Sequence, residues 1–262
     1  MRKYKSYILG GSMVLLVLLI WQIASDTGIF GKYDINRGRL MLPSPVFVFK
    51  RMVELTLNGY LLRHIWISFK RVMIGFLIAI LMGFPLGIFM GRKESVKMFI
   101  QPIFKILAPI PGVAWVPLAI LWFGLGDDAA IFIIVVSAIT PIVTNIIQGV
   151  ESMNPDFENL FKTLKASKWQ SIKFLIIPSV IPYVVTGFKL GLGYAWRVVI
   201  AAEMVGVPDG MGYVLNLGRS TAQTEITFIT IIVLCIMLIL MEKCLFGRLE
   251  SLTSAWKSKG EI

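Results

Sequence analysis

The sequence predicts an all-α membrane protein with six transmembrane helices. Hydrophobic residues make up 56% of the 262 residues and charged residues only 16%, with a mean hydropathy of +0.78. A soluble protein carries about 25% charged residues and could not bury so many apolar side chains in one core. Several long uncharged segments are each able to cross the roughly 30 Å hydrocarbon layer of a bilayer. We therefore expect residues 1–262 to form a single transmembrane domain.

Six segments have the length and composition of a span. They are expected at residues 7–25, 66–91, 103–124, 129–150, 178–205 and 225–246. The first follows a basic start and is compatible with a signal peptide, but Ile23-Ala24-Ser25 is a poor cleavage site, which favours an uncleaved span. A short amphipathic helix is predicted at residues 45–60, directly after Leu42-Pro-Ser-Pro45, because its apolar positions follow a 3.6-residue period.

The distribution of the net charge of +11 predicts the orientation of the spans. Both ends of the chain are basic, as are the loops after the second and fourth spans, whereas Gly124–Asp128 is short and acidic. Positive loops stay in the cytoplasm, so both termini and these two loops are expected there. The basic segment Asp26–Arg71, which includes Lys32, Arg37 and Arg39, departs from this rule, and we expect it outside or partly at the interface.

Glycine and proline positions predict how the spans pack. Gly83, Gly87 and Gly91 recur every four residues, as do Gly187 and Gly191, and this spacing lets helix backbones approach closely. The third span contains Pro109, Pro111 and Pro117, which remove backbone donors and predict a kinked or partly unwound helix. Irregular backbone at membrane depth must be buried in protein or line a cavity, so this span is expected to border a translocation path.

The fifth span carries three charged residues, Lys189, Arg197 and Glu203. Charges within a span are costly and favour a functional role, here a basic wall that attracts a small anion along a central path. The alternative is that Lys189 reaches the interface or pairs internally, and that Arg197 is interfacial. Trp115 and Trp196 either line the same path, together with Pro109 and Pro111, or belong to an interfacial aromatic belt.

The basic loop from Glu151 to Pro178 is long for a connection without function. Asn154 and Pro155 are typical of a helix start, and Leu160, Phe161 and Leu164 give that helix an apolar face. Ser167 can cap a second helix that contains Trp169. Such a helical hairpin either binds a soluble partner or packs on its own membrane domain.

Several chemistries are excluded or unsupported by the motifs. No GxxxxGK[ST] phosphate loop occurs, so the chain is not expected to hydrolyse ATP by itself. The single histidine, His64, excludes zinc motifs of the HExxH kind. Cys235 and Cys244 form neither a CxxC motif nor an expected disulfide.

The loop resembles the EAA motif of ABC importer permeases, E-A-A-x3-G-x9-I-x-L-P. Asn159-Leu160-Phe161 stands at its start, Lys165 at its glycine and Leu175-Ile-Ile-Pro178 at its end. The flanking segments resemble the nitrate/sulfonate/taurine branch of that family, in collinear order over residues 42–250. They include Pro109-Ile-Pro-Gly-Val-Ala-Trp115, Leu175-Ile-Ile-Pro-Ser-Val-Ile-Pro182, Thr186-Gly-Phe-Lys-Leu-Gly-Leu-Gly-Tyr-Ala-Trp196 and Ala201-Ala-Glu-Met204.

The resemblance implies a type I ABC importer permease in a bacterial inner membrane. Such a permease is not an enzyme and binds neither a cofactor nor nucleic acid. The resemblance also implies a second permease copy, in a homodimer or heterodimer, two separate ATPase subunits that hold ATP and Mg, and a periplasmic or lipid-anchored solute-binding protein. The loop at residues 151–177 would then couple to the ATPase. The implied coupling residues are Asn154, Asp156, Glu158, Asn159, Leu160, Phe161, Leu164, Lys165, Ala166 and Trp169.

The motif's glycine permits a positive-φ turn between the two loop helices, whereas Lys165 would adopt that conformation at a steric cost. Two other functions remain open: a membrane anchor that recruits a soluble enzyme, and a secondary transporter driven by an ion gradient. No inverted repeat is visible, and the intramembrane acids reduce to Glu203, which weighs against the secondary transporter. Nitrate, sulfonates, taurine and heterocyclic vitamin precursors all remain possible solutes.

Overall fold

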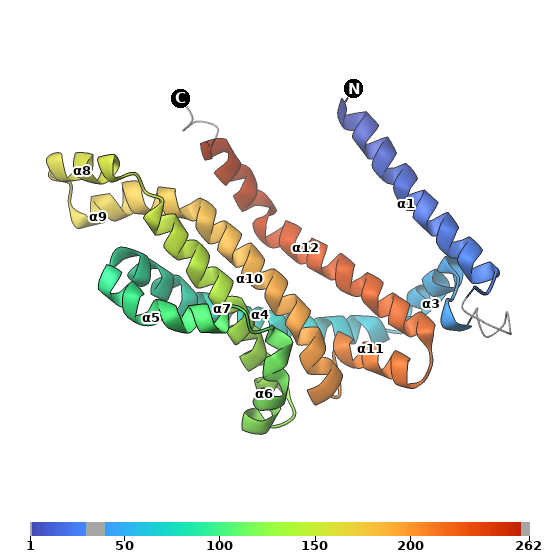
Figure 1. Cartoon of the computed structure of the whole chain (residues 1–262). Helices are drawn as coiled ribbons and strands as arrows, with labels where there is room; N and C mark the ends of the chain where they lie inside the picture. The colour runs from blue at the N-terminus through green and yellow to red at the C-terminus, as the bar shows by residue number, and fades with distance from the viewer. Residues whose placement is uncertain (1, 30–39, 258–262) are drawn as a thin grey trace. The chain divides into compact units, whose positions relative to one another are not determined.

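The computed structural model describes residues 2–29 and 40–257, and these residues are mostly helical and form no strand (Figure 1). Lys32, Arg37 and Arg39 of the predicted outer segment lie outside the described residues. The helices, in chain order, are α1 (Arg2–Asp26), α3 (Pro45–Leu57), α4 (Tyr60–Arg92), α5 (Glu94–Leu107), η1 (Gly112–Trp115), α6 (Val116–Phe123), α7 (Asp127–Glu151), α8 (Pro155–Thr163), α9 (Lys168–Ser171), η2 (Ile172–Ile176), α10 (Ile177–Gly206), α11 (Met211–Ser220) and α12 (Thr224–Lys257).

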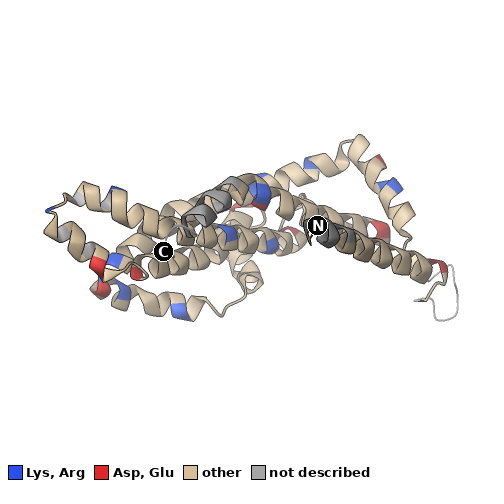
Figure 2. Cartoon of the chain, turned by 90° about the horizontal axis from the view of Figure 1, so that it is seen from above, with Lys and Arg blue, Asp and Glu red and all other residues tan. Residues whose placement is uncertain are grey.

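Within the described residues, five helical stretches are long and apolar enough to cross a membrane. They are Leu9–Asp26, Tyr60–Arg92, Asp127–Glu151, Trp169–Gly206 and Thr224–Gly247. Figure 2 shows long stretches of helix in which charged residues are sparse. The pair Glu94–Leu107 and Gly112–Phe123 meets the same test together but bends by 90°, and it makes the sixth span if it is counted as one broken span.

The first of two compact units comprises the described residues of Met1–Trp66 and Asp209–Cys235. Here α1 is tied to the start of α3, because the indole N–H of Trp21 donates to the Pro43 carbonyl at 3.0 Å and Ser25 Oγ donates to the Leu42 carbonyl at 2.7 Å. Ser44 caps α3 by accepting from the Phe47 N–H. The Leu42–Pro45 motif therefore binds α1 through two backbone carbonyls and also caps the start of α3.

The second unit comprises the described residues of Ile67–Pro208 and Ile236–Ile262. Its core is the long pair α7 and α10, with α4 packed on α7 through glycines. A Cβ on Gly87 would lie 2.8 Å from Ile146 Cβ, and one on Gly91 would lie 2.7 Å from Val150 Cβ. Gly191 of α10 approaches Ile142 from the other side, where a Cβ would lie 3.0 Å from its Cγ1. The predicted close packing at both glycine series is confirmed.

The third predicted span, for which the prolines predicted a kinked or partly unwound helix, is broken. Helix α5 ends at Leu107, the chain turns through Ala108–Pro111, and it resumes as the short helices η1 and α6. Gly112 enters η1 so close to α7 and α10 that an added Cβ would clash with Ser137 and lie 2.9 Å from Val198 Cγ2. The break is thus held by close packing on two helices, and it is not a smooth kink in one continuous helix.

Candidate functional site

Helix α8 begins where the sequence predicts. Asn154 Oδ1 accepts a hydrogen bond from the Asp156 N–H at 2.8 Å, and Pro155 occupies the first helical position, where no backbone donor is needed. Thr163 Oγ1 donates to the Asn159 carbonyl at 2.9 Å near the other end of the helix. The side chain of Glu158 lies outside the described residues.

The turn after α8 places Lys165 in the left-handed region, with φ at +51°. The Ala166 N–H donates to the Phe161 carbonyl at 3.0 Å across this residue, which is the six-to-one bond of a Schellman motif. Such motifs favour glycine at the left-handed position, and the EAA motif has glycine there. The geometry of the turn is therefore kept although its residue has changed.

Helix α9 is capped reciprocally. Ser167 Oγ accepts from the Gln170 N–H at 3.2 Å, and Gln170 Oε1 accepts from the Ser167 N–H at 2.7 Å. This is a capping box, and it confirms the predicted role of Ser167. The chain then passes through the π-helical turn η2 into α10, whose second residue is Pro178.

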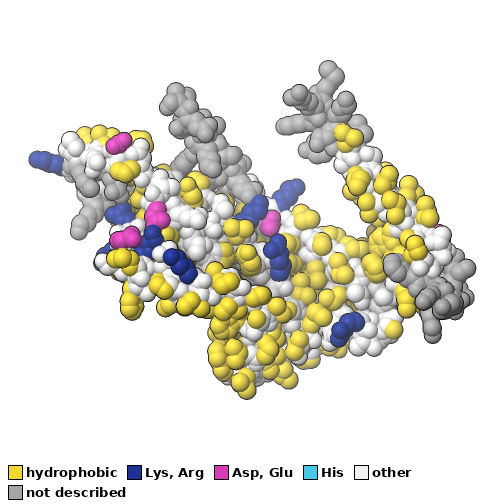
Figure 3. Space-filling model, viewed as in Figure 1, with side chains coloured by type: hydrophobic (Ala, Val, Ile, Leu, Met, Phe, Trp, Pro, Cys, Tyr) yellow, Lys and Arg dark blue, Asp and Glu magenta, His cyan; other side chains and the backbone are white. Residues whose placement is uncertain are grey.

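Large apolar side chains of this hairpin are exposed. Figure 3 shows apolar side chains on the surface of α8. Trp169 and Leu164 are 69% and 68% exposed, and Phe157 and Leu160 are exposed as well. Asp156 and Asn159 are exposed beside them, while Phe161 and Ala166 are partly buried. We call Phe157, Leu160, Leu164 and Trp169 the hairpin patch; its exposed apolar side chains have the character of a docking surface.

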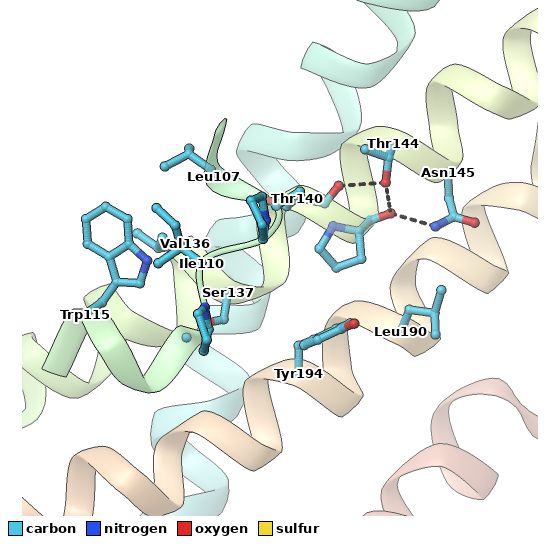
Figure 4. A pocket seen from close by; sticks show the side chains of 15 residues that line it. Leu107, Ile110, Trp115, Val136, Ser137, Thr140, Thr144, Asn145, Leu190 and Tyr194 are labelled. Carbon is cyan, nitrogen blue, oxygen red and sulfur yellow. Dashed lines mark hydrogen bonds between the residues drawn. The ribbon is translucent and has the colours of Figure 1, made fainter. Parts of the chain in front are cut away.

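A pocket of about 350 Å³ lies beside the break between α5 and α6 (Figure 4). Its walls come from the break itself, α7 and α10. Pro109, Pro111 and Trp115, three of the predicted path residues, line it. Its polar lining consists of five residues that were not predicted from the sequence: Ser137, Thr140, Thr144, Asn145 and Tyr194.

The other four predicted path residues do not line this pocket. Arg197 is exposed and lines a smaller hollow of about 130 Å³ that shares Gly112, Ser137 and Tyr194 with it. Lys189 Nζ lies 3.8 Å from Glu242 Oε2 of α12, as the internal-pairing alternative expects. The side chain of Trp196 is buried.

Glu203 is buried in a cluster of polar side chains. Arg71 Nη1 donates to its Oε1 at 2.8 Å, and Ser68 Oγ lies 2.8 Å from both of its carboxylate oxygens. Arg71 Nε also donates to Asp127 Oδ1 at 2.7 Å, in the first turn of α7. The carboxylate therefore has partners on α4, and its contacts are those of a structural ion pair. Within the described residues, no group of three or more His, Cys, Asp or Glu side chains is placed to hold a metal ion.

Comparison with known proteins places these features in a family. Residues 83–245, more than half of the chain, match the model of the family described as "binding-protein-dependent transport system inner membrane component". The chain belongs to this family of ABC importer permeases. The permease is 28% identical over 237 residues to the taurine transport system permease protein TauC of Escherichia coli (strain K12), covering 88% of this chain and 83% of TauC. It is 33% identical over 209 residues to the nitrate import permease protein NrtB of Synechocystis sp., covering 76% of this chain and 72% of NrtB.

A solved structure confirms the predicted fold class. The permease matches a chain of the MetNI methionine ABC transporter, solved in inward-facing conformations, with a TM-score of 0.58 and 16% identity. The match covers 78% of this permease and 97% of that chain. At this identity the likeness shows the fold, which is an all-α multi-pass membrane permease.

The residues that sequence reasoning missed fall into two groups. Ser137, Thr140 and Thr144 show an i, i+3, i+7 spacing on one helix face, which was available as a signal in the sequence. Arg71 gives no such signal, because it ends the basic segment Asp26–Arg71 and directly precedes the uncharged run of α4.

Proposed function

We propose that this permease is the membrane subunit of an ATP-driven, binding-protein-dependent importer that moves a small anionic solute into the cytoplasm. Two separate ATPase subunits bind ATP and Mg, a second permease copy completes the path, and an external binding protein delivers the solute. The permease itself binds no cofactor and is not an enzyme. Family membership carries the importer part of this proposal. The family's general operation supplies ATP coupling and alternating access.

The hairpin patch supports coupling through residues 151–177 to the ATPase. The apolar side chains lie on two capped helices that a tight turn connects. Such a helical hairpin can transmit movement better than a flexible loop. Closure of the ATPase dimer would push the two hairpins together, and the spans would swing between inward-open and outward-open states. In this arrangement the hairpin, both termini and the loop after the second span are cytoplasmic, and the described residues between α1 and α4 lie on the outer side or at the interface.

The chemistry of the solute is supported by the relatives and by the charge near the pocket. The relatives are named for taurine and nitrate; taurine carries a sulfonate group, and nitrate is itself a small oxyanion. Arg197 stands in the hollow that adjoins the pocket, and no carboxylate lines either space among the described residues. A small oxyanion is therefore the solute class that fits best.

Co-purification tests the proposal. The tagged permease, solubilised from its native membrane, should bring down a subunit that contains a GxxxxGK[ST] motif and whose ATP hydrolysis is stimulated by a binding protein. Leu160→Asp or Trp169→Asp should abolish this association, because a charge would be buried in an apolar contact. Gln223→Asp adds the same charge at an exposed turn and should leave the association intact. A different soluble enzyme without ATPase activity in the complex would instead indicate a membrane anchor.

A further inference from the structure

One wall of the pocket is a row of hydroxyl side chains on α7. Ser137, Thr140 and Thr144 follow one face of the helix at i, i+3 and i+7. The Thr144 hydroxyl donates to the Thr140 and Pro141 carbonyls, so its hydrogen-bond donor is already used (Figure 4). Ser137 Oγ is buried and has no hydrogen-bond partner among the described residues. A buried hydroxyl without a partner is costly and uncommon, so its donor is available to a ligand.

The facing wall on α10 adds a second hydroxyl and a cation. Tyr194 and Arg197 are one turn apart, and the guanidinium carbon of Arg197 lies 6.0 Å from the centroid of the Tyr194 ring. This cation–π contact holds the guanidinium near the shared lining residues Gly112 and Ser137 without neutralising its charge. The hydroxyls of Thr140 and Tyr194 make no hydrogen bond to another described residue.

The charge on these walls has one sign. Among the described residues that line the pocket or the adjoining hollow, Arg197 is the one charged side chain, and no Asp or Glu accompanies it. The free hydroxyls of Ser137, Thr140 and Tyr194 therefore line the pocket of about 350 Å³. The unneutralised guanidinium lies in the adjoining hollow of about 130 Å³, which Ser137 and Tyr194 also line. Guanidinium and hydroxyl donors of this kind suit an oxyanion, because planar N–H pairs match carboxylate, sulfonate or nitrate oxygens.

We propose that the pocket and its adjoining hollow form an oxyanion-binding site within the permease itself. Arg197 holds the anion, Ser137 donates the hydrogen bond that it lacks in the empty site, and Thr140 and Tyr194 complete the donor set. The inference rests on the proposed function, since the site would serve as a waypoint for the imported solute. Binding at a waypoint must be weak enough for the solute to leave, and a single cation with neutral donors meets that condition.

Direct binding to the permease–ATPase complex, without binding protein or nucleotide, tests the site. The probe is methanesulfonate, observed through its methyl protons by saturation-transfer NMR, with sodium nitrate as competitor. The wild-type complex should bind methanesulfonate saturably, and nitrate should displace it. Arg197→Gln should weaken binding by roughly tenfold and Ser137→Ala by about threefold, as expected for one charged and one neutral hydrogen bond. Arg197→Lys should retain an intermediate affinity.

Lys105→Gln is the matched control, because it removes one exposed positive charge that lines neither space. It should bind like wild type. Equal methanesulfonate affinity in wild type and in Arg197→Gln would overturn the site, even if ATP-driven uptake of an anion is demonstrated. Loss of binding in Lys105→Gln to the same degree as in Arg197→Gln would also overturn it. Conversely, Arg197-dependent binding in a complex that transports no anion would contradict the proposed function and leave the site standing.

Discussion

Arg71 and Glu203 form a buried ion pair within the second unit, with Arg71 Nη1 2.8 Å from Glu203 Oε1. The residues are 132 positions apart in the chain. The same guanidinium binds Asp127, so one side chain joins α4 to α7 and to α10. A charge that the sequence assigned to the outer basic segment thus stabilises the helix core.

Removing one partner of this pair should destabilise the fold strongly. Arg71→Leu leaves the Glu203 carboxylate as an uncompensated buried charge and should lower the free energy of unfolding by about 3–5 kcal/mol. Glu203→Leu should cost less, because Arg71 keeps its ion pair with Asp127. The double variant should be less unstable than the sum of the two single variants, because no charge remains buried. Denaturant unfolding of the detergent-solubilised permease measures this double-mutant cycle. Strict additivity would show that the two side chains do not interact.

The glycine contacts between α4 and α7 should tolerate no methyl group. Gly87→Ala brings a Cβ to 2.8 Å from Ile146 Cβ, and such overpacking is expected to destabilise by about 1–3 kcal/mol. Gly193→Ala is the matched control, because it is also a buried helical glycine but its Cβ would meet nothing within 4 Å. Thermal unfolding of the isolated subunit should separate the two variants. Equal melting temperatures would be incompatible with the packing described for Gly87.

Replacing Lys165 by glycine should stabilise the hairpin turn. The left-handed conformation costs an L-residue roughly 1 kcal/mol, and glycine removes that cost. Amide hydrogen exchange of α8 should slow in Lys165→Gly and accelerate in Lys165→Val, since a β-branched residue is least tolerated there. Lys105→Gly, in the helical conformation of α5, should only destabilise its own helix. Faster exchange of α8 in Lys165→Gly would contradict the assigned turn.

His64 should stabilise the first unit as the hydrogen-bond acceptor of the Gly210 N–H. Its Nδ1 accepts the Gly210 N–H at 3.0 Å, and its ring lies between Tyr60 and Tyr213, within the first unit. His64→Leu leaves that buried N–H unpaired and should lower the free energy of unfolding by about 1–3 kcal/mol. His64→Gln, which keeps an acceptor, should recover part of the loss. A leucine variant as stable as wild type would mean that this hydrogen bond contributes nothing.

Local patterns predicted most of the fold. The uncharged runs, the caps at Asn154 and Ser167, and the glycine spacing each depend on neighbours within one or two turns, and the structure contains the corresponding helices and contacts. The prolines predicted a kinked or partly unwound helix, but the 90° break after α5 also involves the close packing of Gly112 against α7 and α10. The Arg71 pair and the Ser137–Arg197 hollow could not be predicted, because each brings together helices far apart in sequence.

Transport into sealed vesicles tests the central proposal most directly. Proteoliposomes would contain the permease with its ATPase subunits, ATP inside or absent, and the binding protein outside with radiolabelled taurine or labelled nitrate. We predict accumulation of at least one of these anions that requires ATP and binding protein together and is lost in Leu160→Asp. Accumulation that follows an ion gradient without ATP, or no accumulation of either anion by an assembled and ATP-hydrolysing complex, would contradict the proposal.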